Sequence, residues 1–303
     1  MEYWKIAALQ SSPPTTAFPY DAGAPGSMNL ELKEWLHLLL RWSHVFAGIL
    51  WVGTTYYFTW LDGRFAELEK RLKEKAGANE PPEKQVWMVH SGGFYVVEKL
   101  KVPNVMPEKL HWFRWEAALT WLTGILLFAL TYYHGGLMVS LEDARISPAA
   151  AVWLSVGLLV VSVPLYDLLW FRLLKNELIG VAVSFGFVVG LSWFLSRFFT
   201  GRAAYLQLGS MFGTIMVANV WMRILPAQRR MVAALTVGKP PDDAEALRAK
   251  KSSKHNTFLV VPVVFMMISN HFPSITYGRG NNWVILSVLV LLGWGGARLL
   301  RRA

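Results

Sequence analysis

The stretch of sequence that decides the fold is WLHLLLRWSHVFAGILWVGTTYYFTWLD, residues 35–62, in which Arg41 is the only charged side chain before the final aspartate. A helix needs about 20 predominantly apolar residues to cross the hydrocarbon core of a bilayer. Similar stretches recur along the chain, and we interpret the spans as residues 35–61, 113–134, 148–171, 177–199, 203–226, 256–273 and 281–300. The sequence therefore predicts an all-α fold, a polytopic membrane helix bundle of about seven transmembrane helices.

Two regions differ from these spans. Residues 1–30 are rich in Pro, Ser and Gly and lack a basic start followed by an apolar core, so we expect a flexible N-terminal tail rather than a signal peptide. Residues 31–303 then form the transmembrane domain. Within it, residues 86–97 (VWMVHSGGFYVV) are too short to span a bilayer. They predict a re-entrant or interfacial element, which would bring the membrane segments to eight.

Composition limits the chemistry and gives an orientation. The chain has no cysteine, which excludes disulfides, thiolate metal sites and c-type haem attached through CxxCH. The formal charge is +10, but basic residues of membrane proteins gather in cytoplasmic loops, so we expect no nucleic-acid partner. Lysines and arginines crowd residues 62–112, 227–254 and the C-terminus, which alternate threading puts on one side. This predicts a multi-pass protein of the cytoplasmic membrane with its N-terminus outside and its C-terminus inside.

Histidines are the most informative polar residues. Alternate threading divides them into two layers, with His37, His44, His134 and His271 toward one membrane face and His90, His111 and His255 toward the other. An ionisable residue inside a membrane indicates a functional site. In a chain without cysteine, imidazole is the natural ligand for iron. Two stacked histidine layers are the pattern that a membrane cytochrome with two haems needs.

The first span carries the densest chemistry. His37, Arg41, His44 and Gly48 follow i, i+4, i+7 and i+11, so they share one helix face. A charged Arg41 inside a bilayer is costly, so we expect it to face the bundle and to meet an anion such as a propionate, a carboxylate or an acidic substrate. A small residue at position 48 allows a neighbouring helix or a flat macrocycle to come close. The alternative is a helix-packing seam held by a polar clamp.

Further polar residues lie on other spans. Glu116 lies one turn into the second span, where Arg114 or a ligating histidine would serve as its partner. Asp167 is the one acid in the third and fourth spans, and we interpret it as a structural hydrogen-bond anchor. Asn219 falls deep within the fifth span, and Arg223 follows at its basic end.

Six segments together resemble one known family. They are HVFAGILWVGTTYYFTWLD (44–62), HSGGFYVVEKL (90–100), PEKLHWFRWEAALTWLTG (107–124), GRAAYLQLGSM (201–211), ANVWMRILPAQRRMVAA (218–234) and KHNTFLVVPVVFMMISNH (254–271). They are similar, in order, to the membrane-integral urate hydroxylase family, the bacterial urate oxidase N-terminal membrane domain. The resemblance implies oxidation of urate to 5-hydroxyisourate and transfer of electrons to a cytochrome c domain. No CxxCH occurs here, and Ser91 replaces one glycine of the family's HGGGFY, so we expect electrons to pass to a separate cytochrome c or other redox protein.

The predicted function is a membrane haem b oxidoreductase with one or two haems. The predicted outer axial ligands are His44 and His271, and the inner ligands come from His90, His111 and His255. We expect Arg41 and Arg114 to bind propionates or the urate anion, and Glu116 with Arg114 to act in catalysis, the carboxylate managing protons for attack by water. The alternative is a non-catalytic haem-binding electron-transfer or scaffold subunit of a larger photosynthetic or respiratory complex. A transporter is less consistent with the sequence, which has no repeat symmetry and no paired broken helices.

Overall fold

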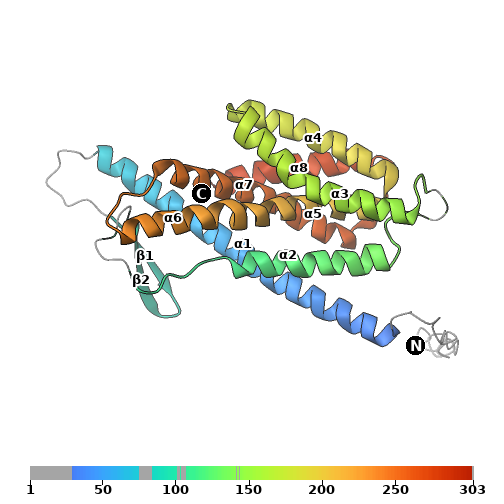
Figure 1. Cartoon of the computed structure of the whole chain (residues 1–303), viewed down its shortest axis with the longest axis horizontal. Helices are drawn as coiled ribbons and strands as arrows, with labels where there is room; N and C mark the ends of the chain where they lie inside the picture. Colours follow the sequence, from blue (N-terminus) through green and yellow to red (C-terminus); the bar gives the residue numbers. More distant parts are fainter. Residues whose placement is uncertain are drawn as a thin grey trace, which may run out of the picture. The chain divides into compact units, whose positions relative to one another are not determined.

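A computed structural model describes residues 29–74, 84–100, 103, 107–140, 142 and 144–301 (Figure 1). The predicted tail, residues 1–30, lies almost wholly outside them. The chain divides into two units, of which residues 29–38 are the described part of the first. This part begins the helix α1, and the Asn29 side chain accepts a hydrogen bond from the Glu31 amide at 2.9 Å, which satisfies one free amide of the first turn. His37 belongs to this part.

The described residues are mainly helical, which confirms the predicted all-α bundle. The helices are α1 (Leu30–Glu74), α2 (Trp115–Phe128), α3 (Pro148–Asp167), α4 (Glu177–Phe198), α5 (Gly201–Ala218), α6 (Leu225–Thr236), α7 (Asp243–Ile268) and α8 (Asn282–Leu300). Wider π-helical turns extend α2 over Ala129–His134 and α3 over Leu168–Leu173, and another joins α5 to α6 over Asn219–Ile224. Short 3-10 turns at Ser269–His271 and Pro273–Ile275 follow α7.

Six of these helical segments are long and apolar enough to cross a membrane, with α5 and α6 counting as one. The segment missing from the six is α7, whose first half (Asp243–Lys254) is charged and whose apolar half begins near Asn256. Each of the seven spans predicted from the sequence is nevertheless helical over most of its length. The chain therefore has the helices of a multi-pass membrane protein.

The core gathers around α5, which packs against α2, α3, α4 and α7. Tyr205, Leu208 and Met266 are fully buried there, together with Val290 from α8. Figure 1 shows α5 running on into α6 through the middle of the other helices. The α1 segment is largely uncovered by comparison, with 6% of its apolar window buried. It therefore contacts the other helices at a few points only.

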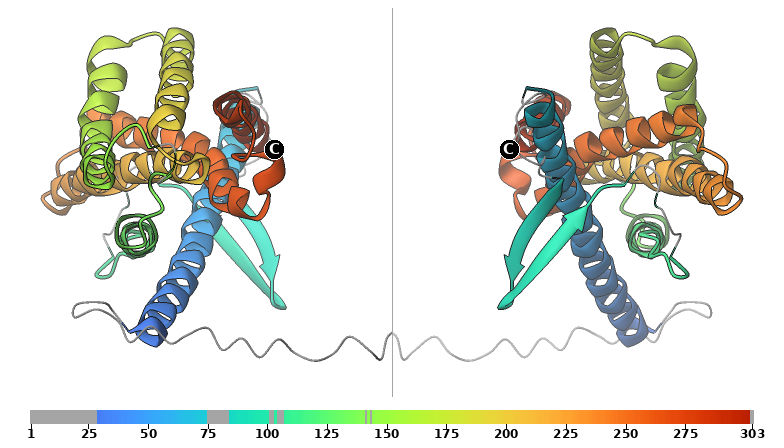
Figure 2. Two further views of the ribbon diagram at one scale, coloured as in Figure 1. Left: turned by 90° about the vertical axis from the view of Figure 1, so that its right-hand side faces the viewer. Right: turned by 90° about the vertical axis from the view of Figure 1, so that its left-hand side faces the viewer.

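Residues 86–97 were expected to form a re-entrant or interfacial element, and the structure specifies what they form. They make a β-hairpin of β1 (Gln85–His90) and β2 (Gly93–Glu98), paired antiparallel with His90 opposite Gly93 (Figure 2). Its two turn residues both have positive φ, 48° at Ser91 and 79° at Gly92, as a tight hairpin turn requires. The two strands thus pair their facing backbone groups without a helix.

Candidate functional site

His44 is the predicted site residue with the best-defined environment. Its Nδ1 lies 2.8 Å from the backbone oxygen of Thr120 in α2. A carbonyl oxygen only accepts hydrogen bonds, so Nδ1 must carry the proton and donate it. In the neutral ring this leaves a lone pair on Nε2, which is the form of imidazole that binds a metal.

A glycine of α2 makes room for the imidazole. A Cβ atom built on Gly124 would lie 2.7 Å from His44 Cε1 and 3.0 Å from Nδ1, closer than real Cβ atoms approach other atoms. At Gly48, where the sequence suggested a close approach, a Cβ would meet only the Thr120 methyl group at 3.8 Å. The glycine that admits the histidine is therefore on the neighbouring helix.

The position of His44 along α2 differs from the predicted layering. Thr120 and Gly124 lie one to two turns into α2, whereas His134 ends that span, about 15 Å beyond Gly124 along the helix. The expectation that His44 and His134 occupy one layer is therefore wrong. The physical reason is that α1 passes α2 obliquely instead of running beside it for its whole length (Figure 1).

The other residues predicted to bind haem or an anion are more exposed than His44. Arg41 is exposed and has no acidic partner among the described residues, so the expectation that it lies inside the bundle is wrong. It is on the same face of α1 as His44, but one turn before the residue that contacts α2. His271 is exposed in the turn after α7, and His90 is exposed in the hairpin. His111 is also exposed, with its ring 4.5 Å from the Phe113 ring. The described residues contain no cluster of three or more potential metal ligands.

Arg114 and Glu116 stand at the start of α2 but do not pair with each other. The guanidinium group of Arg114 lies over the Trp115 ring, 5.4 Å from its centroid. Glu116 is half-buried, and its carboxylate has no hydrogen bond or ion pair within the described part of the chain. Because Glu116 and Thr120 are four residues apart, they share the helix face that His44 contacts.

His255 belongs to a hydrogen-bonded network deep in the bundle. Its Nδ1 lies 2.6 Å from the Tyr166 hydroxyl oxygen, which also accepts a hydrogen bond from Asn219 Nδ2 at 3.2 Å. The Asn219 side-chain oxygen in turn accepts from Arg223 at 2.7 Å, and Arg223 forms an ion pair with Asp167. The network therefore links a histidine of α7 to an acid at the end of α3.

This network fixes the proton on His255. Arginine is donor-only, so the Asn219 oxygen must face Arg223 and the Asn219 amide must donate to Tyr166. The hydroxyl proton of Tyr166 then has one acceptor among the described residues, His255 Nδ1. Apolar surroundings and two nearby lysines, Lys251 and Lys254, disfavour a charged ring. The neutral ring thus carries its proton on Nε2, opposite to His44.

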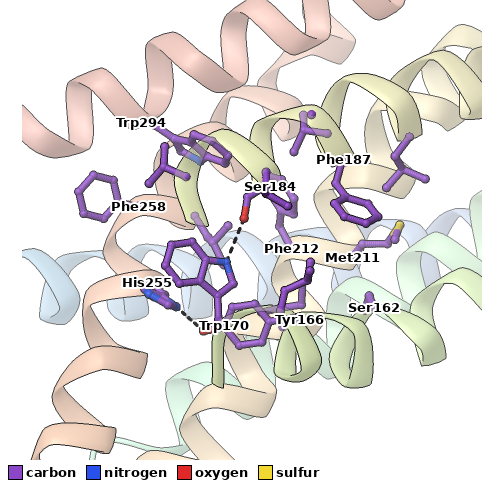
Figure 3. Close-up of a pocket in the computed structure, with 18 of the residues that line it drawn as sticks. Ser162, Tyr166, Trp170, Ser184, Phe187, Met211, Phe212, His255, Phe258 and Trp294 are labelled. Carbon is purple, nitrogen blue, oxygen red and sulfur yellow. Dashed lines mark hydrogen bonds between the residues drawn. The ribbon is translucent and has the colours of Figure 1, made fainter. Parts of the chain in front are cut away.

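A large apolar cavity adjoins His255 (Figure 3). It is open on one side, where lining residues such as Leu178 and Phe187 are exposed. It has a volume of about 1450 Å³ and lies between α3, α4, α5, α7 and α8. Aromatic side chains supply much of its wall, namely Tyr166, Trp170, Phe187, Phe212, Phe258 and Trp294. The Trp170 indole donates to the Ser184 hydroxyl at 3.0 Å across one side. The charged side chains of the cavity come from the start of α4, from α7 and from the end of α8, namely Glu177, Lys254, Arg298 and Arg301.

Comparison with known proteins gives one match. The family described as urate oxidase N-terminal matches residues 30–299. The chain belongs to this family. No curated protein and no solved structure matches it.

The segments that resemble this urate oxidase family build both sites. Residues 44–62 and 107–124 meet at the contact of His44 with Thr120. Residues 218–234 and 254–271 supply Asn219, Arg223 and His255 to the network. Sequence reasoning did not find Tyr166 or the pairing of Arg223 with Asp167. The sequence did contain a signal for this pair, because Asp167 is the one acid of its span and Arg223 lies at the same end of another span.

Proposed function

We propose that this member of the urate oxidase N-terminal family is a multi-pass membrane oxidoreductase that binds haem b and takes part in oxidation of urate to 5-hydroxyisourate. Family membership supports a urate-oxidase-related function. The observation that carries the haem proposal is the bond from His44 Nδ1 to the Thr120 carbonyl. Iron-binding histidines typically donate their second ring nitrogen to such an acceptor, which holds the ring and its tautomer.

The donor chemistry of His44 fits one axial position of a haem. When bound, haem b would supply a site for one-electron transfer, with a potential set by its axial ligands and surroundings. His44 would hold the iron through its Nε2 lone pair. Thr120 and the space above Gly124 would fix the plane of the imidazole ring.

His271 would be the second residue to hold the iron. The Tyr56 hydroxyl donates to the Thr257 backbone oxygen at 3.3 Å, which aligns α1 with α7 at that height. The two helices run in opposite directions in Figure 1. From this contact His44 lies about 18 Å along α1, and His271 lies about 21 Å along α7. The two histidines thus lie on the same side of this contact, as their pairing would require. His90 and His111 stay candidates for a second haem.

His255 is a poorer candidate for ligation than the sequence suggests. Its Nε2 carries a proton because Tyr166 donates to Nδ1. Binding iron would require the Tyr166 hydroxyl to turn away from the ring and leave its proton without an acceptor in the described part of the chain. We therefore assign His255 to the cavity and not to iron.

Residues at the start of α2 would act on the substrate. Urate oxidation adds water and releases two electrons and two protons, so a base is needed near the reacting carbon. Glu116 has an unpaired carboxylate on the face of α2 that His44 contacts, which suits that role. Arg114 would attract the urate anion, and Arg41, exposed on α1, would meet a haem propionate.

The electrons would leave to a redox protein such as a cytochrome c, within a larger membrane complex or by transient docking. The proposed orientation has the N-terminus outside the cytoplasmic membrane and the C-terminus inside. The clustering of basic residues in 62–112 and 227–254 supports it. A non-catalytic electron-transfer subunit would share the haem site and lack the response to urate.

The test is the optical spectrum of the purified chain with and without urate. We expect a b-type spectrum that urate reduces, and we expect the His44→Ala variant to lose most of its haem. His134→Ala is the matched control, because His134 is exposed at the end of a span and has no role in the proposal. Unchanged haem content in His44→Ala would refute the ligand assignment. A spectrum that urate does not change would favour the alternative function, a non-catalytic electron-transfer subunit.

A further inference from the structure

The cavity beside His255 is elongated. Along α4 its wall runs from Glu177 to Phe194, a rise of about 26 Å. Its volume of about 1450 Å³ exceeds the roughly 300–1,000 Å³ of ordinary small-molecule sites. Helical glycines of α4, Gly186 and Gly190, line it with open space around them. These dimensions suit a molecule with a long apolar chain.

The polar groups of the cavity lie at one end. Glu177 begins α4, and Lys254 and His255 precede the apolar half of α7. Arg298 is in the last turn of α8, and Arg301 follows that helix. Lys254 donates to the Glu177 carboxylate at 2.5 Å, so this ion pair neutralises itself. A ligand in the cavity would therefore have a polar head at this end and its chain along α4.

The chemistry of the head follows from His255. Its Nδ1 accepts from Tyr166, so its Nε2–H is a donor, and this atom has no partner within the described part of the chain. The Tyr166 hydroxyl is held in place by Asn219, and Asn219 by the ion-paired Arg223. His255 thus presents a neutral N–H donor at the polar end, which fits a carbonyl oxygen.

We propose that this cavity binds an isoprenoid quinone, with a head carbonyl on His255 Nε2–H and the isoprenoid chain along α4. A neutral carbonyl fits a neutral donor. Lys254 is paired with Glu177, and Arg301 donates to Thr257 Oγ1 at 3.3 Å. A phospholipid phosphate would use the remaining cation at this end, Arg298, and the displacement experiment below separates the two ligands. The redox role of the quinone rests on the proposed function. In that role the quinone would take the electrons in place of a separate redox protein. Urate, water and quinone would give 5-hydroxyisourate and hydroquinone, with two electrons and two protons moving from urate and water to the quinone.

The test is binding of decylubiquinone to the full chain in detergent, measured by equilibrium dialysis without urate. Leucine at position 186 or 190 would fill the cavity, so we expect Gly186→Leu and Gly190→Leu to weaken binding at least tenfold. Gly157→Leu is the matched control, since Gly157 has equally open space and lies outside the cavity wall. His255→Phe keeps a ring and removes the donor, and we expect a loss of about fivefold to tenfold, as one hydrogen bond predicts.

The proposal fails if both cavity-filling variants bind decylubiquinone as tightly as the Gly157→Leu control. It also fails if phosphatidylglycerol displaces the quinone with equal affinity, because the site would then be a lipid site. Haem content is measured in the same samples. Absence of haem with intact, His255-dependent quinone binding would refute the proposed haem function alone, so the two failures are distinguishable.

Discussion

Replacing Gly124 by alanine tests the His44 site with the smallest possible change. The added methyl carbon would lie 2.7 Å from His44 Cε1, so the ring must move by roughly 0.7 Å to regain an ordinary contact. Such a shift stretches the 2.8 Å bond from Nδ1 to the Thr120 oxygen beyond the usual hydrogen-bond range.

The expected energy follows from three effects. Overpacking costs about 1–3 kcal/mol, and a weakened hydrogen bond costs about 1 kcal/mol. Alanine in place of glycine in a helix offsets about 0.5–1 kcal/mol of this. The Gly124→Ala variant should therefore lose about 1–3 kcal/mol of stability, together with much of its haem.

The control is Gly157→Ala, a helical glycine with no atom within 4 Å of the added carbon. It should gain about 0.5–1 kcal/mol from helix propensity alone. The assay is thermal unfolding in detergent, with haem per protein measured on the same preparations. If Gly124→Ala matches Gly157→Ala in both stability and haem content, the absence of a side chain at Gly124 does not position His44.

Three further predictions concern the network and the hairpin. Asp167→Asn leaves the buried Arg223 guanidinium without its counter-charge and should cost about 2–4 kcal/mol in a denaturant titration; a loss below 0.5 kcal/mol would contradict this. Tyr166→Phe removes the donor to His255 and should cost about 1–3 kcal/mol, and unchanged quinone affinity in that variant would show that the tautomer does not matter. Gly92→Ala should destabilise the hairpin by about 1 kcal/mol because φ is +79° there, which faster proteolysis between residues 85 and 98 would reveal.

Local sequence determined the helices of this protein. In a bilayer every backbone N–H and C=O needs a partner within its own segment, so long apolar stretches such as residues 177–199 become helices whatever their neighbours are. The hairpin was harder to predict, because its strands pair with each other across the turn at Ser91 and Gly92. Short apolar runs carry no period that separates such strands from an interfacial helix.

The sequence also singled out His44, because an ionisable side chain within an apolar span is costly and indicates a functional site. The tertiary structure decided what surrounds it. Thr120 and Gly124 lie on a different helix, and no spacing along the chain indicates which carbonyl or which glycine will face the ring. Arg41 was placed wrongly for the same reason, since a helical face is known from the sequence but its neighbours are not.

The opposite protonation of the two histidines is the clearest case that only the tertiary structure decides. His44 and His255 are the same residue type, the first inside an apolar stretch and the second at the start of one. Thr120 offers His44 a carbonyl that only accepts, whereas Asn219, oriented by Arg223, leaves the Tyr166 proton for His255. A tautomer depends on donors and acceptors brought together by packing of distant helices, and the order of residues along the chain does not specify that packing.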